Sequence, residues 1–184
     1  MSGGLLLLRC FIAVVLFSHG VQKSLGWLQG PGLARSTVIF EGLGHHPGRR
    51  MVLVAATCEI LAATLLALGL FTPLGAAVAA GTLGVAGLSQ VFSVKALWNS
   101  MGGGEYPLSL AVAALVIGFT GPGAWSIDHA AIVDSWPEAT GFVVLGVALV
   151  AAVPPALRSF QHFHRRQSVP AQPIDSTPTH QEGR

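Results

Sequence analysis

Three ionisable residues lie inside apolar stretches of the sequence, where side chains that can do chemistry are unusual. Arg9 lies early in the first apolar stretch, His19 near its end, and Glu59 near the middle of the second. A charged side chain at the centre of a bilayer costs roughly 2.5–3.5 kcal/mol on insertion scales, so such residues usually face the protein interior and meet a polar partner. A carboxyl group such as that of Glu59 can exchange a proton with a bound ligand, and His19 or Arg9 can donate a hydrogen bond to it. We therefore take Glu59, His19 and Arg9 as candidate catalytic residues.

The depths of these residues favour one pairing. Counted at ~1.5 Å per residue from the cytoplasmic ends of their helices, His19 lies ~6 Å deep, Glu59 ~13 Å and Arg9 ~21 Å. Glu59 falls between the two bases, the long arginine side chain can close the gap, and a water can bridge to His19. We expect an Arg9–Glu59 pair, which serves either as a functional site or as a structural ion pair that fixes helix register.

A second polar group surrounds the glycine run at 102–104. Glu105 and Tyr106 follow this run directly, and Pro107 is well placed in the first turn of a new helix. Negative charge is stabilised at a helix N-terminus. We expect Lys23, Glu105 and Tyr106 to form a ligand-binding cluster with His19 at the cytoplasmic face, although ordinary capping explains Glu105 more simply.

The cysteines and the paired histidines carry weaker signals. Cys10 and Cys58 each adjoin a charged residue, but their depths differ by ~8 Å, whereas a disulfide needs Cα atoms within about 7 Å. We therefore expect buried thiols and regard a redox pair as the less favoured alternative. His45 and His46 have no acidic or cysteine partner at metal-ligand spacing, so no metal site is expected.

Composition places all of these residues in a membrane protein. Of the 184 residues 52% are hydrophobic and 10% charged, and the mean hydropathy is +0.63. A soluble domain needs more charge to cover its surface. No basic stretch is interleaved with aromatic residues, so nucleic-acid binding has no support. The first apolar stretch lacks a signal-peptidase site and is expected to be a retained helix.

About 20 apolar residues cross a bilayer, and the chain contains several such stretches. We predict an all-α membrane fold over 1–157, with transmembrane helices at about 5–21, 51–71, 74–92, 106–120 and 140–153. An interfacial helix is expected at about 33–43, between glycine-containing breaks. Pro154-Pro155 precede a polar segment, 158–184, which we expect to be a disordered cytoplasmic tail.

The basic residues predict the orientation of the bundle. With five crossings, one side of the membrane receives these cations: Lys23, Arg35, Arg49, Arg50, Lys95, Arg158, Arg165 and Arg166. The loop at 121–138 contains acidic residues and neither Lys nor Arg. Cytoplasmic loops carry the excess of Lys and Arg. We expect a multi-pass plasma-membrane protein with its N-terminus outside and its C-terminus in the cytoplasm.

Several short motifs follow one another in a characteristic order between residues 5 and 130. They are Leu8-Arg9, Ser18-His19-Gly20-Val21-Gln22-Lys23, Phe40-Glu41-Gly42-Leu43-Gly44, Cys58-Glu59, Leu68-Gly69-Leu70-Phe71-Thr72-Pro73, Gly103-Gly104-Glu105-Tyr106-Pro107 and Ser126-Ile127-Asp128. In these motifs the sequence resembles the DoxX family of small bacterial membrane proteins. The resemblance implies a four-helix transmembrane bundle, to which the fifth, C-terminal helix is an addition. It also implies that Arg9, His19, Lys23, Glu59 and Glu105 occupy the family's recurrent polar positions.

The resemblance further implies a redox setting, because DoxX proteins are associated with thiosulfate:quinone oxidoreduction and with membrane complexes of oxidative stress. The sequence contains no flavin or dinucleotide fingerprint, haem motif or Cys-x-x-Cys. We expect no covalently bound cofactor, and a quinone from the bilayer or a redox partner as the electron carrier. The leading hypothesis is the membrane subunit of a redox system, working with soluble redox enzymes or a second membrane subunit. Two questions stay open: whether this subunit is itself catalytic, as a quinone-linked oxidoreductase, and whether it forms oligomers.

Two alternatives remain. A small-solute or proton-coupled transporter would use Arg9, Glu59 and His19 as a relay, but no inverted repeat is visible. A non-catalytic scaffold for soluble redox enzymes would need no polar group inside the membrane.

Overall fold

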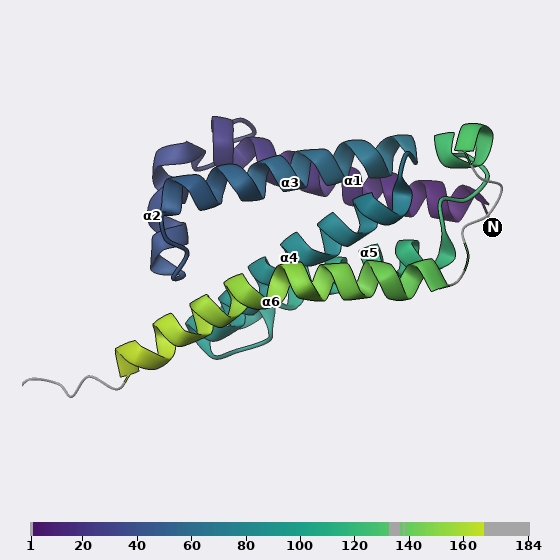
Figure 1. The fold of residues 1–184 in the computed structure, drawn as a ribbon. Coiled ribbons are helices and arrows are strands. Elements are labelled where there is room, and N and C mark those ends of the chain that lie inside the picture. The colour runs from purple at the N-terminus through teal and green to yellow at the C-terminus, as the bar shows by residue number, and fades with distance from the viewer. Residues whose placement is uncertain (1, 133–136, 138, 168–184) are drawn as a thin grey trace, which may run out of the picture.

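The computed structural model describes residues 2–132, 137 and 139–167, and within them every secondary-structure element is a helix (Figure 1). Four helices are long and apolar enough to cross a membrane: α1 (Ser2–Leu25), α3 (Gly48–Leu68), α4 (Thr72–Val94) and α6 (Ala139–Gln167). The fourth of the five predicted transmembrane helices, at about 106–120, is present as α5 (Glu105–Thr120), whose 16 residues rise about 24 Å, somewhat less than a hydrocarbon core. The predicted all-α membrane fold is confirmed.

Shorter elements close the two ends of the bundle. The predicted interfacial helix is present as α2 (Gly32–Gly42), which lies across one end of α1 and α3 (Figure 1). The 3₁₀ turn η1 (Asn99–Met101) joins α4 to α5 at that same end. A π-helical turn, η2 (Asp128–Ile132), lies at the other end, in the segment that was predicted as a loop.

The helices form two layers. In Figure 1, α1 and α3 form the upper layer and α4, α5 and α6 the lower one, with α4 in contact with α3, α5 and α6. The tight α3–α4 hairpin follows from its sequence. Gly69 ends α3 with φ of 62°, and the amides of Gly69 and Leu70 donate to the carbonyls of Leu66 and Leu65, which is a Schellman motif. Thr72 and Pro73 then begin α4.

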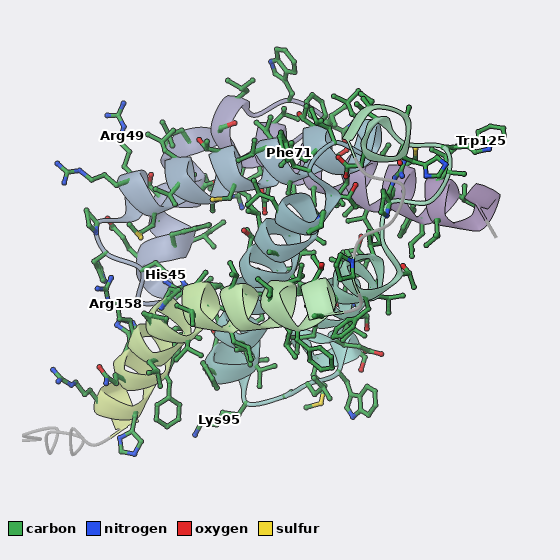
Figure 2. All side chains as sticks on the ribbon, turned by 45° about the vertical axis from the view of Figure 1, so that its right-hand side comes forward. His45, Arg49, Phe71, Lys95, Trp125 and Arg158 are labelled. Atoms are coloured by element: carbon green, nitrogen blue, oxygen red, sulfur yellow. The ribbon has the colours of Figure 1, made fainter. Side chains whose placement is uncertain are left out.

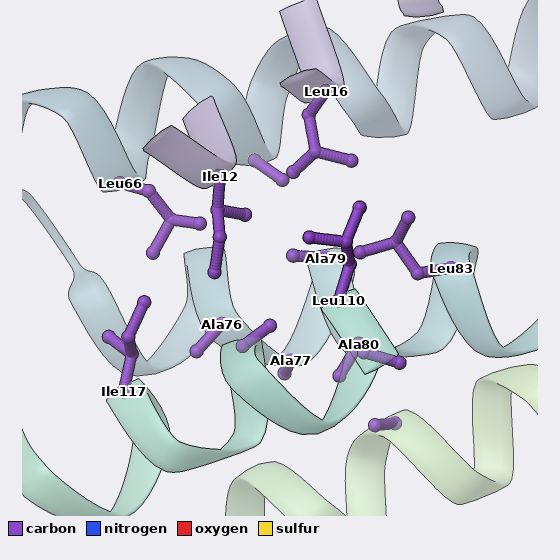
Figure 3. Close-up of a cluster of buried hydrophobic side chains, with 14 of the residues drawn as sticks. Ile12, Leu16, Leu66, Ala76, Ala77, Ala79, Ala80, Leu83, Leu110 and Ile117 are labelled. Atoms are coloured by element: carbon purple, nitrogen blue, oxygen red, sulfur yellow. The ribbon is translucent and has the colours of Figure 1, made fainter. Parts of the chain in front are cut away.

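The two layers meet in a core of large aliphatic side chains that face small ones (Figure 3). Ile12 and Leu16 come from α1, and Leu110 and Ile117 from α5. Helix α4 contributes mainly alanine and glycine, which allow helices to approach closely. The outer surface is apolar as well, since Leu7 and Val150 are 72% and 75% exposed. A surface of this kind suits lipid as its surroundings.

Helix α6 is longer than predicted. Pro154 and Pro155 lie inside it, and the helix continues to Gln167, so the disordered tail predicted from 158 is wrong for residues 158–167. Proline weakens a helix because it lacks a backbone donor. After the two prolines, however, Ala156 and Ser159 are buried against the rest of the bundle. Tertiary packing therefore keeps the chain helical. Residues 168–184 of the predicted tail lie outside the described residues.

Candidate functional site

An ion pair joins α1 to α3 inside the bundle. Lys23 Nζ donates a hydrogen bond of 2.6 Å to Glu59 Oε1. Glu59 is only 3% exposed, and its second carboxylate oxygen, Oε2, is buried without a hydrogen-bond partner. One oxygen of the Glu59 carboxylate therefore binds Lys23, and the other has no partner and can accept a hydrogen bond.

The direction of helical side chains explains this pairing. In an α-helix each Cα–Cβ bond tilts toward the N-terminus. Since α1 continues to Leu25, Lys23 lies within the helix, and its side chain can lean back into the bundle toward Glu59. The same rule directs the side chain of Arg9 toward the opposite end of the molecule.

A cavity of about 170 Å³ lies beside the lysine of this pair, between α1 and α2. Its lining consists of His19, Gln22, Lys23, Pro31, Ser36, Ile39 and Phe40. Ser36 is 1% exposed, and its hydroxyl has no hydrogen-bond partner. The ammonium of Lys23 lies 5.7 Å from the centroid of the Phe40 ring. The lining therefore combines hydrogen-bond donors with an aromatic face.

Contacts at both ends of α2 hold this wall of the cavity in place. Gln22 Nε2 donates to the carbonyl of Leu28 at 3.3 Å, and the amide of Gly48 donates to Glu41 Oε1 at 3.2 Å. A Cβ at Gly48 would lie 2.5 Å from Glu41 Cγ, so a glycine is required for this contact. The positions of Ser36 and Phe40 follow from these attachments.

The outer face of α2 presents large apolar side chains beside the exposed Arg35. Val38 is 69% exposed and Ile39 47%, whereas the polar Ser36 faces inward. A surface helix in water shows the opposite pattern. Helix α2 therefore separates the polar interior near Lys23 from a lipid-like environment.

Arg9 lies at the other end of the bundle. It is 1% exposed, and its guanidinium donates to the carbonyls of Pro122 and Trp125, the latter at 2.7 Å. Figure 2 shows Trp125 near the beginning of α1. Arg9 thus fastens the segment after α5 onto α1.

The carboxylate of Asp128 completes this cluster. It accepts the amides of Phe71 and Thr72 at 2.7 and 2.8 Å, and so caps the N-terminus of α4. The amide of Asp128 in turn donates to the carbonyl of Gly69 at 2.9 Å. We refer to Arg9, Asp128 and the backbone groups they bind as the Arg9 clamp.

The predicted Arg9–Glu59 pair is therefore wrong. The turn that contacts the Arg9 clamp begins at Gly69, about 15 Å from Glu59 along α3. The depth estimate used Cα positions alone. It ignored the directions of the side chains, although Arg9 and Glu59 point toward opposite ends of the bundle. The same separation divides Arg9 from Glu59 in the relay of Arg9, Glu59 and His19 that was considered for a transporter.

The other predicted site residues divide into two sets. His19 and Lys23 line the cavity, His19 with an exposed side chain. Glu105 instead accepts the amide of Asn99 at 3.0 Å, as capping requires, and Tyr106 is 45% exposed. Neither Glu105 nor Tyr106 lines the cavity, so the expected single cluster with His19 and Lys23 is not formed. Their role in ligand binding stays a prediction.

Sequence reasoning missed three residues. Ser36 and Phe40 are four residues apart on the predicted interfacial helix, a spacing that places them on one face and could have indicated an inward-facing pair. Asp128 was noted as an acidic residue of a loop and as part of the motif Ser126-Ile127-Asp128, with no structural role assigned to it. Its role as a cap of α4 depends on a contact across 56 residues of sequence, for which no local signal exists.

A larger groove, of about 450 Å³, lies on the outer face of α1 and α3. Its lining has no charged side chain and consists of Cys10, Ala13, Val14, Phe17, Ser18, Ala63, Thr64, Ala67 and Leu68. Cys10 and Cys58 are both free thiols. The smaller cavity, and not this groove, lies next to the ionisable pair.

Comparison with known proteins identifies the family. No curated protein and no solved structure matches the chain. The profile of the DoxX family matches residues 4–95, half of the chain, and this part holds α1 to α4, the Lys23–Glu59 pair and the cavity wall formed by α2. Helices α5 and α6 lie beyond the matched residues. The chain thus belongs to the DoxX family of membrane proteins.

Proposed function

We propose that this DoxX protein is the membrane subunit of a redox system and that it binds a quinone headgroup in the cavity between α1 and α2. The observation that carries the proposal is the state of Glu59. Its carboxylate is buried, one oxygen is paired with Lys23, the other has no partner, and Lys23 also lines the cavity. Polar groups with spare hydrogen-bonding capacity inside a membrane are by default candidates for function.

The cavity fits a quinone in chemistry and in size. A quinone ring offers two carbonyl oxygens as acceptors, and Lys23, His19 and the unpartnered hydroxyl of Ser36 are available donors. The Phe40 ring supplies an aromatic face for stacking. A volume of 170 Å³ suits a single ring better than the larger ligands that fill pockets of about 300–1,000 Å³. The large apolar side chains on the outer face of α2 suit an isoprenoid tail that remains in the lipid.

A bound quinone would supply two-electron, two-proton redox chemistry. Glu59 would hold a proton at Oε2, while Lys23 fixes the orientation of the carboxyl through Oε1 and donates toward the cavity. Ser36 and His19 would orient the ring. The electrons would come from, or pass to, a soluble redox enzyme or a second membrane subunit, in thiosulfate or oxidative-stress metabolism.

We further propose that the cavity opens at the cytoplasmic end of the bundle. The described residues at this end include a group of cations: Lys23, Arg35, Arg49, Arg50, Lys95, Arg158 and Arg165. Asp128 lies at the opposite end, beside the start of α4. Under the positive-inside rule, the basic end faces the cytoplasm of a plasma-membrane protein and the N-terminus lies outside.

The test is equilibrium binding of decylubiquinone to the protein in lipid nanodiscs. The wild type should bind saturably, and Ser36→Ala, Phe40→Leu and Glu59→Gln should each weaken binding by about tenfold, the effect of one lost hydrogen bond or ring contact. Arg35→Gln, on the exposed side of α2, is the matched control and should leave affinity unchanged. Equal affinity in all variants, or no saturable binding, would overturn the proposal and favour a scaffold without a small-molecule site.

A further inference from the structure

The C-terminal arm of α6, residues 156–165, packs against the loop that joins α2 to α3. A Cβ added to Gly44 of this loop would lie 2.7 Å from His162 Cβ and 3.3 Å from Ser159 Cα, and Gly44 has φ of +85°. The rings of His46 and His162 are 6.1 Å apart. The arm belongs to α6, which lies outside the residues that match the DoxX family, so this junction attaches an added helix to the family's core.

His45 lies at the centre of the junction. It is 6% exposed, and its Nε2 is 2.9 Å from the hydroxyl of Ser89 on α4, which is itself completely buried. Its ring also lies 5.8 Å from that of Phe40 on α2. The arm, α2 and α4 therefore meet at one histidine ring (Figure 2 labels His45 and Arg158 at this end).

The titratable and charged groups around His45 would oppose a positive charge on its ring. His46 comes from the same loop, and Arg158 and His162 come from the arm. Helix α4 contributes the uncharged Ser89, and the carboxylate of Glu41 on α2 is engaged with the amide of Gly48. The charged groups that act on His45 are His46, Arg158 and His162, and the carboxylate of Glu41 is not among them.

Burial lowers the pKa of His45, and the nearby His46, Arg158 and His162 lower it further. The docked state thus binds fewer protons than the undocked one. Its stability is complete above the ordinary histidine pKa of about 6.5, and decreases as the pH falls from that value toward the lowered pKa of the docked state.

We propose that the loop at 43–47 and the arm of α6 form a pH-sensitive latch in which His45 is the switch, so that acidification at this end of the bundle releases the arm. The proposal rests on the geometry of the junction and is independent of quinone binding. A proton on the buried imidazole would meet Arg158, and none of the charged groups that act on His45 within the described residues is anionic. Moving the arm away from the loop lets water reach the His45 ring and separates its positive charge from that of Arg158.

The test uses spin labels on Arg50→Cys and Gln161→Cys, two exposed positions on either side of the junction, in a Cys10→Ser/Cys58→Ser background. The protein is reconstituted in nanodiscs, and distances are measured by pulsed electron resonance. At about pH 7.5 one short distance is expected, and at about pH 5 more than about half of the population should shift to longer distances. His45→Gln, which stays neutral, should keep the short distance at both pH values.

Controls keep the latch falsifiable. His46→Gln changes an exposed histidine of the same loop and should retain most of the pH response. Arg158→Gln removes one opposing charge and should reduce the shifted population, which tests the latch even if His45→Gln does not fold. Unchanged distances in the wild type, or a full response in His45→Gln, would overturn the proposal.

Discussion

The two ends of α1 use buried charge in different ways. In the Arg9 clamp, the guanidinium and the Asp128 carboxylate bind backbone groups of two connecting segments. At the other end, Lys23 and Glu59 bind each other, one carboxylate oxygen has no hydrogen-bond partner, and Lys23 lines a cavity. Arg9 Nε also lacks a partner, but neither Arg9 nor the residues it binds line the two cavities described above, whereas Lys23, the partner of Glu59, lines the smaller one. A buried charge whose hydrogen bonds all go to backbone groups of connecting segments has a structural role. A buried ion pair that has an unpartnered oxygen and one member lining a cavity is a candidate for ligand binding.

The largest effect on stability is expected from Arg9→Met. It leaves the carbonyls of Pro122 and Trp125 without their donors and should lower the free energy of unfolding by about 3–5 kcal/mol. Chemical unfolding in detergent micelles measures this change. Arg35→Met, at an exposed position, should cost no more than about 0.5 kcal/mol. A mild effect of Arg9→Met would remove the clamp from the account.

Neutralising both residues of the Lys23–Glu59 pair should lower the free energy of unfolding less than removing Lys23 alone. Lys23→Met alone leaves a buried carboxylate without its cation and should cost about 3 kcal/mol. The double variant Lys23→Met/Glu59→Gln removes both charges, so it should regain most of that stability in the same unfolding assay, yet bind decylubiquinone weakly. A double variant that is no more stable than Lys23→Met would show that the pair is needed to hold the fold.

Gly69 offers a smaller test of the Arg9 clamp. An added Cβ would lie 2.5 Å from Ser126 Cβ and 2.8 Å from Arg9 Nη1, at a residue with φ of +62°. Gly69→Ala should therefore lower the free energy of unfolding by about 1–3 kcal/mol. Gly146→Ala is the control, because a Cβ there meets nothing within 4 Å and the residue is helical. Equal stability of the two variants would contradict the tight packing at the clamp.

The smallest effect on stability is expected at the cavity. Ser36→Ala removes a hydroxyl that has no partner, so the free energy of unfolding should change by less than about 1 kcal/mol. The same variant should lose affinity for decylubiquinone. A large loss of stability would mean that the hydroxyl is already engaged in holding α2, which would weaken the comparison between the two ends.

The elements of the fold could be predicted from the sequence because apolar runs and turn residues are local signals. Helix α2 lies almost where it was expected, and Thr72 and Pro73 begin α4 directly after the turn. The continuation of α6 through Pro154 and Pro155 was not predictable, since it depends on packing against distant residues.

The candidate site was predictable in some of its members, but Ser36 and Phe40 were missed and the contacts were not predicted. Glu59 and His19 stood out as polar residues in apolar stretches and Lys23 as a member of a cytoplasmic-face cluster, and Lys23 and Glu59 do meet. Their pairing and the separation of Arg9 depend on the direction in which each side chain leaves its helix. The role of Asp128 depends on the chain after α5 returning to the α3–α4 turn.

Photoaffinity labelling with an azidoquinone, followed by mapping of the modified peptides, tests most directly which end of α1 binds a ligand. Labelling that decylubiquinone displaces should map to residues 19–40 of the wild type and decrease in Ser36→Ala. Displaceable labelling around Arg9, residues 69–72 or residues 121–128 would contradict the account, because it would place the binding site in the clamp.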